Sequence, residues 1–90
     1  MSRARNEALI NAFAVVLLQA RLRREMTQEE LSRLAEIDRT YLGLLETSRR
    51  QPTLSVISAL EQAVGEAPGG LVAKAFALWQ GTNLGHADRP

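Results

Sequence analysis

The 90-residue chain contains no cysteine and a single histidine, His86. Without cysteine it cannot form disulfides, thiolate metal sites or a cysteine nucleophile. One histidine near the end of the chain leaves almost nothing from which to build a zinc site or a histidine-based catalytic triad. We therefore expect a protein that is not an enzyme and that binds neither a metal nor another cofactor.

The chain also lacks a long hydrophobic run and a strong excess of charge. Its longest apolar stretch, residues 9–18, is broken by Asn11 and is about half as long as a membrane-spanning helix. An arginine-rich segment follows this stretch without a small-residue cleavage site, which is not the form of a signal peptide. Eleven basic and ten acidic residues leave a net charge of only +1. We expect a soluble, cytoplasmic protein with no membrane partner.

The hydrophobic spacing is helical throughout, with no lasting period-two alternation and no Asn-Gly or Asp-Gly hairpin signal. It predicts helices at 6–24, 28–35, 39–47, from about 53 to Gly65, and 71–80. We predict an all-α, compact five-helix bundle forming one domain over 1–90, divided into a core at 6–66, a C-terminal helix at 68–80 that mediates dimerisation, and a flexible tail at 81–90.

Local signals support the two short central helices. Thr27 and Glu30 have the spacing of a capping box, and Asp38 is a favourable N-cap for the next helix. The side chains expected to face the core in the second, third and fourth helices are Leu31, Leu34, Ala35, Leu42, Leu45, Leu54, Ile57, Leu60 and Val64.

Two short capped helices separated by a tight turn form a helix-turn-helix candidate. From Phe13 to Gly65 the chain resembles the lambda-repressor-like, or Xre, family of DNA-binding domains. The resemblance is carried by Phe13-Ala14-x-x-Leu17, Arg21, Met26-Thr27-Gln28-Glu29-Glu30-Leu31, Ala35, Leu42-x-x-Leu45-Glu46 and Arg50-x-Pro52-x-Leu54-x-x-Ile57. It implies a bacterial or phage protein that places its third helix in the major groove of double-stranded DNA, like a phage-type repressor, a restriction-modification controller or an antitoxin-type autoregulator.

The third helix has a face suited to contact with bases. When Leu42 and Leu45 point inward, the residues that project outward are Thr40, Gly43, Leu44 and Thr47, and Arg39 lies on the flank of this face. Gly43 weakens the helix by about 1 kcal/mol, which is explained if another molecule must approach closely. We predict base contacts by Arg39, Thr40, Gly43 and Leu44. The alternatives are that Gly43 packs against another protein helix and that Leu44 belongs to the core.

Phosphate contacts are predicted around this face. The resemblance implies that Gln28, in the first turn of the second helix, anchors a phosphate, although it could simply be an N-terminal hydrogen bonder. Further side chains on or just past the third helix are placed to hold the DNA backbone: Tyr41, Thr47, Ser48, Arg49 and Arg50. A basic run such as Arg49-Arg50 could also be an ordinary solvated surface.

The resemblance assigns Arg21 and Glu46 to structure, as an internal ion pair between the first helix and the end of the third. Removing either partner is expected to lower stability by about 3 kcal/mol, and to reduce DNA binding only through loss of the fold. The chain departs from the family where glycine is frequent, because it has Glu25, Glu36 and, after Glu46, Thr47 and Ser48. If Glu36, in the turn between the second and third helices, adopts a left-handed conformation, the cost is about 1 kcal/mol.

The first and last helices carry more apolar surface than one small core needs. We predict a homodimer through Val15, Leu18, Leu22, Leu71, Val72, Ala75, Phe76 and Trp79. The alternative is that the last helix only covers the first within one chain. Two other functions stay open: an adaptor that binds a protein partner on a repressor-like scaffold, and an RNA-binding or enzyme-accessory module, which the lack of an aromatic stacking platform disfavours.

Overall fold

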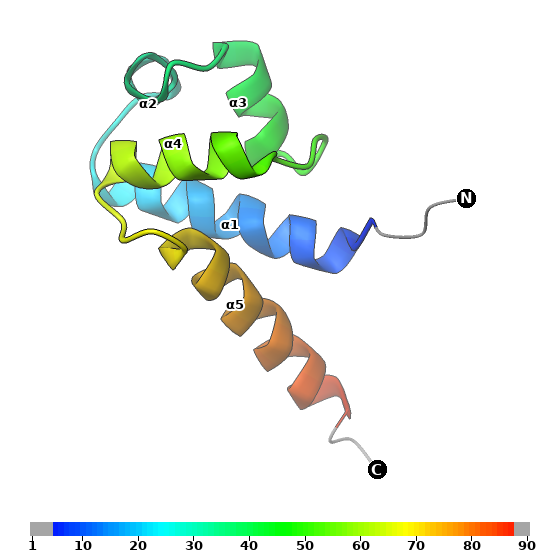
Figure 1. Cartoon of the computed structure of the whole chain (residues 1–90). Coiled ribbons are helices and arrows are strands. Elements are labelled where there is room, and N and C mark those ends of the chain that lie inside the picture. Colours follow the sequence, from blue (N-terminus) through cyan, green and yellow to red (C-terminus); the bar gives the residue numbers. More distant parts are fainter. Residues whose placement is uncertain (1–4, 88–90) are drawn as a thin grey trace.

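A computed structural model of the chain describes residues 5–87, with side-chain surroundings for residues 5–81. This part of the chain contains five helices and no strand: α1 (Glu7–Arg23), α2 (Gln28–Ala35), α3 (Arg39–Glu46), α4 (Leu54–Val64) and α5 (Gly70–Ala87). The all-α, five-helix prediction is confirmed. Figure 1 shows α2 and α3 on one side of α4, with α1 and α5 on the other. Within the described residues, no helix combines the length and the apolar content needed to cross a membrane.

Each of the first four helices begins at a residue whose side chain caps it. The capping residues are Asn6, Thr27, Asp38 and Thr53, and each accepts a hydrogen bond from the backbone N–H three residues later. At α2 the box is reciprocal, because Glu30 Oε1 also accepts from the Thr27 N–H at 2.8 Å. These caps satisfy N–H groups that have no partner inside the helix, and they fix the starts of α2 and α3 where the sequence predicted them.

The same four helices end in the same way. The residues after them, Glu25, Glu36, Ser48 and Gly65, all have left-handed backbone angles, with φ between 57° and 75°. The next N–H then turns back to a carbonyl five residues earlier, as from Ile37 N to Ser32 O at 2.9 Å. Only one of the four residues is glycine, so three helix ends hold a conformation that costs a side-chain-bearing residue roughly 1–2 kcal/mol.

One hydrophobic cluster draws on all five helices. Its most deeply buried side chains are Leu17, Leu31, Leu42, Leu45, Leu60 and Leu71. Two residues predicted to face inward do not, since Leu34 is 61% exposed and Leu54 is 85% exposed. The buried face of α2 is centred on Leu31, Ser32 and Ala35, and Leu34 lies about 100° from that centre at helical spacing. Leu54 is the first residue of α4, where no neighbouring helix covers it.

The last helix is longer than predicted. It was expected to end near Gln80 with a flexible tail at 81–90, but α5 continues to Ala87. Gly81 weakens a helix by about 1 kcal/mol without preventing it, and no proline follows until Pro90. The final three residues of the predicted tail lie outside the described residues. In Figure 1, the second half of α5 extends past the other helices.

A buried carboxylate holds the start of α5. Glu61 on α4 is 4% exposed, and its two oxygens accept from the N–H groups of Gly69 at 2.9 Å and Leu71 at 3.1 Å. The carboxylate supplies acceptors to otherwise unpaired N–H groups, and its charge favours the positive end of the helix dipole. Glu61 therefore fixes the junction between α4 and α5, a role that the sequence did not indicate.

Replacing Glu61 by alanine should lower the free energy of unfolding by about 2–3 kcal/mol, because two N–H groups at the start of α5 lose their acceptor. Chemical denaturation measures this loss. The control is Lys74→Ala, which breaks a half-exposed pair with Glu66 (Nζ to Oε2, 2.6 Å) and should cost less than about 1 kcal/mol. Equal losses for the two variants would show that the Glu61 cap is dispensable.

Replacing Glu36 by glycine should raise the free energy of unfolding by about 0.5–1 kcal/mol. The left-handed strain disappears, and the greater freedom of glycine in the unfolded chain offsets part of the gain. The same denaturation experiment applied to Arg33→Gly, inside α2, should show a loss of about 1 kcal/mol. A loss at both positions would contradict the strain argument.

Candidate nucleic-acid interface

The outward face of α3 is open to solvent. Arg39, Thr40 and Thr47 are exposed, and Gly43 and Leu44 are half-buried. Leu44 is not among the apolar side chains that pack against the hydrophobic cluster. The alternative that Leu44 belongs to the core is therefore wrong, and the face predicted to contact bases lies on the surface.

Gly43 has no neighbour that requires it to be glycine. A Cβ atom added there would meet only Gln28 Nε2, at 4.0 Å, which is an ordinary van der Waals distance. The alternative that Gly43 allows close packing against another helix of this chain is therefore wrong. An alanine would fit and would favour the helix, so stability of the chain alone does not account for this glycine.

The side chain of Gln28 crosses from α2 to α3. Its Nε2 atom donates to Glu46 Oε1 at 2.9 Å, and the Gln28 residue remains half-buried at the edge of the exposed face. The amide thus lies beside the surface predicted to contact DNA, while one of its N–H groups is committed to a buried carboxylate. The hydrogen bond from Gln28 to Glu46 joins two helices, so the role of Gln28 is not limited to the N-terminus of α2.

Arg21 and Glu46 form the ion pair that the resemblance implied. Arg21 Nε lies 2.7 Å from Glu46 Oε2 and Arg21 Nη2 lies 3.0 Å from Oε1, a bidentate geometry. The two side chains are only 11% and 4% exposed. A third donor, Nη1, binds the Met26 carbonyl at 2.8 Å, just before α2 begins. The guanidinium therefore connects α1 to both helices of the helix-turn-helix motif.

The remaining predicted phosphate contacts surround the end of α3. Arg49 and Arg50 are exposed, and within residues 5–87 neither they nor Arg39 pair with an acidic side chain. Their charges remain available to an anionic partner. The Thr47 hydroxyl already donates to Gly43 O at 2.9 Å, so it could only accept another hydrogen bond. Of the other residues predicted to contact phosphate, Tyr41 packs against the core and Ser48 has a left-handed backbone conformation. The backbone N–H of Arg49 donates to Leu44 O at 2.8 Å.

The predicted dimer residues divide into two groups. Leu71 and Ala75 are 0% and 1% exposed, because α5 packs on α1 and inserts them into the protomer's own core. Their assignment to a dimer interface is therefore wrong. The other six stay partly or fully exposed: Val15, Leu18, Leu22, Val72, Phe76 and Trp79. Val15 and Leu22 are 44% and 56% exposed, although Val15 lies beside Lys74 and Leu78 of α5 and Leu18 is half-buried. The single-chain alternative, in which α5 covers this side of α1, therefore holds only in part.

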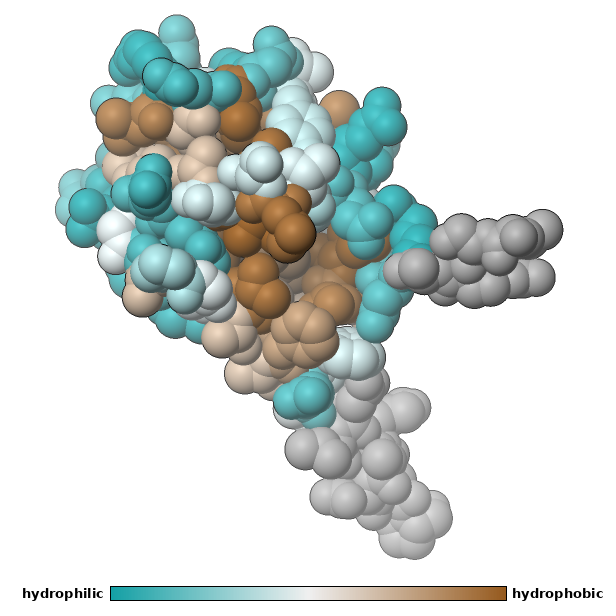
Figure 2. All heavy atoms as spheres, in the orientation of Figure 1, coloured by the Kyte–Doolittle hydropathy of each residue, from teal (hydrophilic) through white to brown (hydrophobic). Residues whose placement is uncertain are grey.

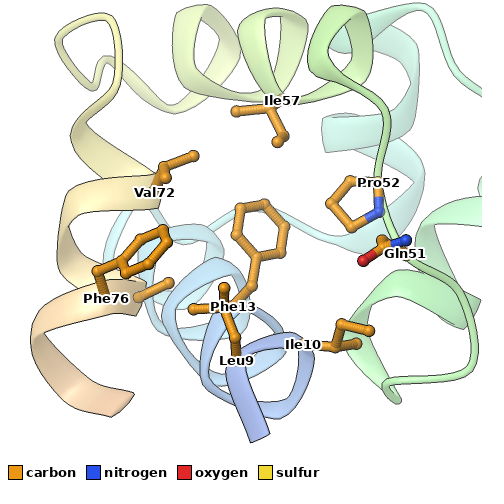
Figure 3. Close-up of a pocket in the computed structure, with 9 residues that line it drawn as sticks. Leu9, Ile10, Phe13, Gln51, Pro52, Ile57, Val72 and Phe76 are labelled. Carbon is orange, nitrogen blue, oxygen red and sulfur yellow. The ribbon is translucent and has the colours of Figure 1, made fainter. Parts of the chain in front are cut away.

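An apolar groove that sequence reasoning missed lies beside α5. It has a volume of about 160 Å³ and brings together α1, α5, the start of α4 and the segment before it. Figure 2 shows apolar side chains gathered between α4 and α5 on this face, and Figure 3 shows how the groove residues point toward one another. They are Leu9, Ile10, Phe13, Gln51, Pro52, Ile57, Val72, Ala75 and Phe76, and none carries a charge.

Comparison with known proteins places this geometry in a wider group. Residues 17–71 match the profile of the family described as helix-turn-helix. An uncharacterized HTH-type transcriptional regulator of Sinorhizobium fredii, y4dJ, is 46% identical over 48 residues, which make up 51% of this chain and 62% of that protein. The chain thus spans less than two thirds of this relative.

Solved structures share the fold. The restriction-modification controller protein C.AhdI of Aeromonas hydrophila is 31% identical, with a TM-score of 0.67 over 69% of this chain and 94% of its own. The hypothetical transcription factor NHTF from Neisseria is 30% identical, with a TM-score of 0.68 over 80% of this chain and 84% of its own. The controller C.Esp1396I, solved as a tetramer with its natural 35 base-pair operator, is 22% identical (TM-score 0.72, covering 80% and 95%) and shows the fold alone. These proteins are described as regulators and not as enzymes.

Proposed function

The chain belongs to the helix-turn-helix family of transcriptional regulators, and from this premise we propose that it binds double-stranded DNA in a sequence-specific manner. It does so as a homodimer on a near-palindromic operator, with α3 in the major groove. The observation that carries the proposal is the exposed face of α3. The packing of the chain does not require glycine at position 43, because a Cβ atom would fit there. Around this position Arg39, Arg49 and Arg50 have no acidic partner among the described residues.

The proposed contact residues form two groups, one that contacts bases and one that contacts phosphates. Arg39 reaches O6 and N7 of guanine, Leu44 packs on thymine methyl groups, and Thr40 and Gly43 complete the surface that reads bases. The side chains that hold phosphates, and so set the register without reading sequence, are Gln28, Tyr41, Thr47, Ser48, Arg49 and Arg50. C.Esp1396I, which shares the fold, has been solved in complex with its operator, and this supports DNA binding by a chain of this fold.

Dimerisation sets the form of the operator. Two recognition helices about 34 Å apart read half-sites one helical turn apart, so a two-fold dimer favours a near-palindrome. The groove beside α5 suits such a dimer because it carries no charge. A two-fold axis brings the same patch of both protomers together, so a charged patch would place like charges opposite each other. Phe76, 38% exposed at its edge, stacks edge-to-face on Trp79 with ring centroids 5.7 Å apart. Aromatic side chains of this kind anchor interfaces.

A second function, that of an adaptor for another protein, is favoured by the same groove, since an uncharged apolar surface also fits a foreign helix. One experiment separates the two functions. Purified protein is incubated with fragmented genomic DNA at physiological salt, and the retained DNA is sequenced. A few enriched fragments that share a near-palindrome support the regulator, whereas featureless or absent retention favours the adaptor.

Two arginine variants should differ in kind. Arg39→Ala should weaken operator binding by about 1–3 kcal/mol and relax the preference at one base pair, because a guanine contact is lost. Arg50→Ala should weaken binding to all sequences alike and reduce the slope of log K against log salt by about one, because one phosphate contact is lost. Binding titrations at several salt concentrations measure both effects. Unchanged binding by both folded variants would show that the DNA-binding face is elsewhere.

Gly43→Ala should separate stability from binding. The free energy of unfolding should rise by up to about 1 kcal/mol, because alanine favours the helix and fits without a clash. Operator affinity should fall, because the new methyl group occupies the space where the DNA approaches. Gly81→Ala in α5, where a Cβ also has free space, is the matched control and should leave DNA affinity unchanged. An operator affinity that is unaffected by Gly43→Ala would contradict close approach at this position.

Phe76→Asp should convert the dimer to a monomer, because it places a pair of carboxylates across the two-fold axis at the groove. Light scattering gives the mass directly, and a protein concentration of roughly tens of micromolar exceeds the Kd of a dimer of about micromolar affinity. Val15→Asp tests the other predicted part of the interface, since Val15 is similarly exposed on the other side of α1. Dissociation by Val15→Asp alone would move the interface to that side, and a monomeric parent protein would rule out the dimer.

A further inference from the structure

We propose that Glu46 is a positioning residue for DNA binding, which orients the amide of Gln28 toward a phosphate, and that Arg21 makes this possible by compensating the charge of Glu46. The proposal rests on the proposed function, because it concerns the same face of α3. It gives the buried ion pair a role in recognition that goes beyond holding the fold together.

The orientation of the amide follows from its partner. A carboxylate only accepts hydrogen bonds, so Glu46 Oε1 must face the NH₂ group of Gln28 and not its carbonyl oxygen. The second hydrogen of the same nitrogen then points away from Glu46. Gln28 Nε2 also lies 4.0 Å from the position that a Cβ atom would take at Gly43. The amide therefore offers a donor beside the DNA-facing surface, and phosphate oxygens are acceptors only.

The opposite orientation would be unfavourable for DNA. A free glutamine can rotate by half a turn and present its carbonyl oxygen, which repels phosphate, and it loses rotamer freedom when it binds. Holding one N–H on a side chain that is 4% exposed removes both disadvantages before DNA arrives. Preorganisation of this kind raises affinity by lowering the ordering cost of binding.

An unpaired carboxylate at this place would itself repel DNA. Glu46 Oε1 accepts from Gln28 and from Arg21 Nη2 at 3.0 Å, and Oε2 accepts from Arg21 Nε at 2.7 Å. The bidentate guanidinium compensates the negative charge directly behind the amide. Arg21 thus allows Glu46 to orient Gln28 without opposing the phosphate that Gln28 binds.

The test is a double-mutant cycle on DNA affinity, with the parent protein, Gln28→Ala, Glu46→Gln and the double variant. The probe is a short duplex of random sequence at low salt, because a phosphate contact acts on any sequence. Gln28→Ala should weaken binding by about tenfold, the size expected for a hydrogen bond to a charged group. Glu46→Gln removes the same negative charge in both backgrounds, so orientation of the Gln28 amide is measured by the difference between them. The effect of Glu46→Gln on affinity should be several-fold less favourable when Gln28 is present than in the Gln28→Ala background.

The control is Glu61→Gln, which alters a buried carboxylate away from the α3 face and should leave DNA affinity unchanged while the protein is folded. Equal effects of Glu46→Gln in both backgrounds, or no effect in either, would overturn the positioning role while leaving the proposed function intact. Failure of the parent protein to bind any duplex would overturn both.

A second measurement uses the unaltered protein and so does not depend on the stability of a variant. The Gln28 side-chain amide, assigned in nuclear magnetic resonance spectra of the parent protein through its contacts with neighbouring protons, should show one proton protected from exchange with solvent. Adding duplex DNA should shift the other proton. Two protons that both exchange at the rate of a free amide would overturn the proposal.

Discussion

The position of the helix-turn-helix motif depends on one guanidinium. Arg21, anchored on α1, binds the carbonyl of Met26 before α2 and both carboxylate oxygens of Glu46 at the end of α3. Each contact fixes a different part of the motif, so the two short helices cannot change their relative orientation without breaking at least one of them. Helices of eight residues are too short to be stable alone, and they take their order from this contact and from the core.

The turns impose a second constraint. Four successive helices end in a left-handed residue, and the chain places a side chain on three of these four residues. Tertiary contacts therefore hold each turn against a local preference for another conformation. The resemblance to the lambda-repressor-like family marked these three positions as places where that family often has glycine, but a left-handed conformation was considered only for Glu36. That Glu25, Glu36 and Ser48 take the same geometry shows that packing, and not glycine, determines the path of the chain here.

Much of the fold could be predicted because its signals are local. The caps at Thr27 and Asp38 define where α2 and α3 start, and the exposed face of α3 follows from helical spacing. What failed depends on contacts between distant segments. Spacing alone could not show that Leu34 lies off the buried face, that Leu71 and Ala75 fill the protomer's own core, or that Glu61 reaches the start of α5. The groove needs three separate segments to exist, so no single stretch of sequence contains it.

Because α5 is long, a small change of angle at its attachment point produces a large displacement at its far end. Eighteen residues span about 27 Å, so a rotation of about 10° at the Glu61 cap moves the far end by about 5 Å. The groove proposed for the dimer lies near the start of α5, at Val72, Ala75 and Phe76, so the far end of the helix is outside that groove. Two hydrogen bonds to one buried carboxylate therefore decide where the end of α5 points. A substitution at this junction could redirect that end without altering any residue on the exposed face of α3.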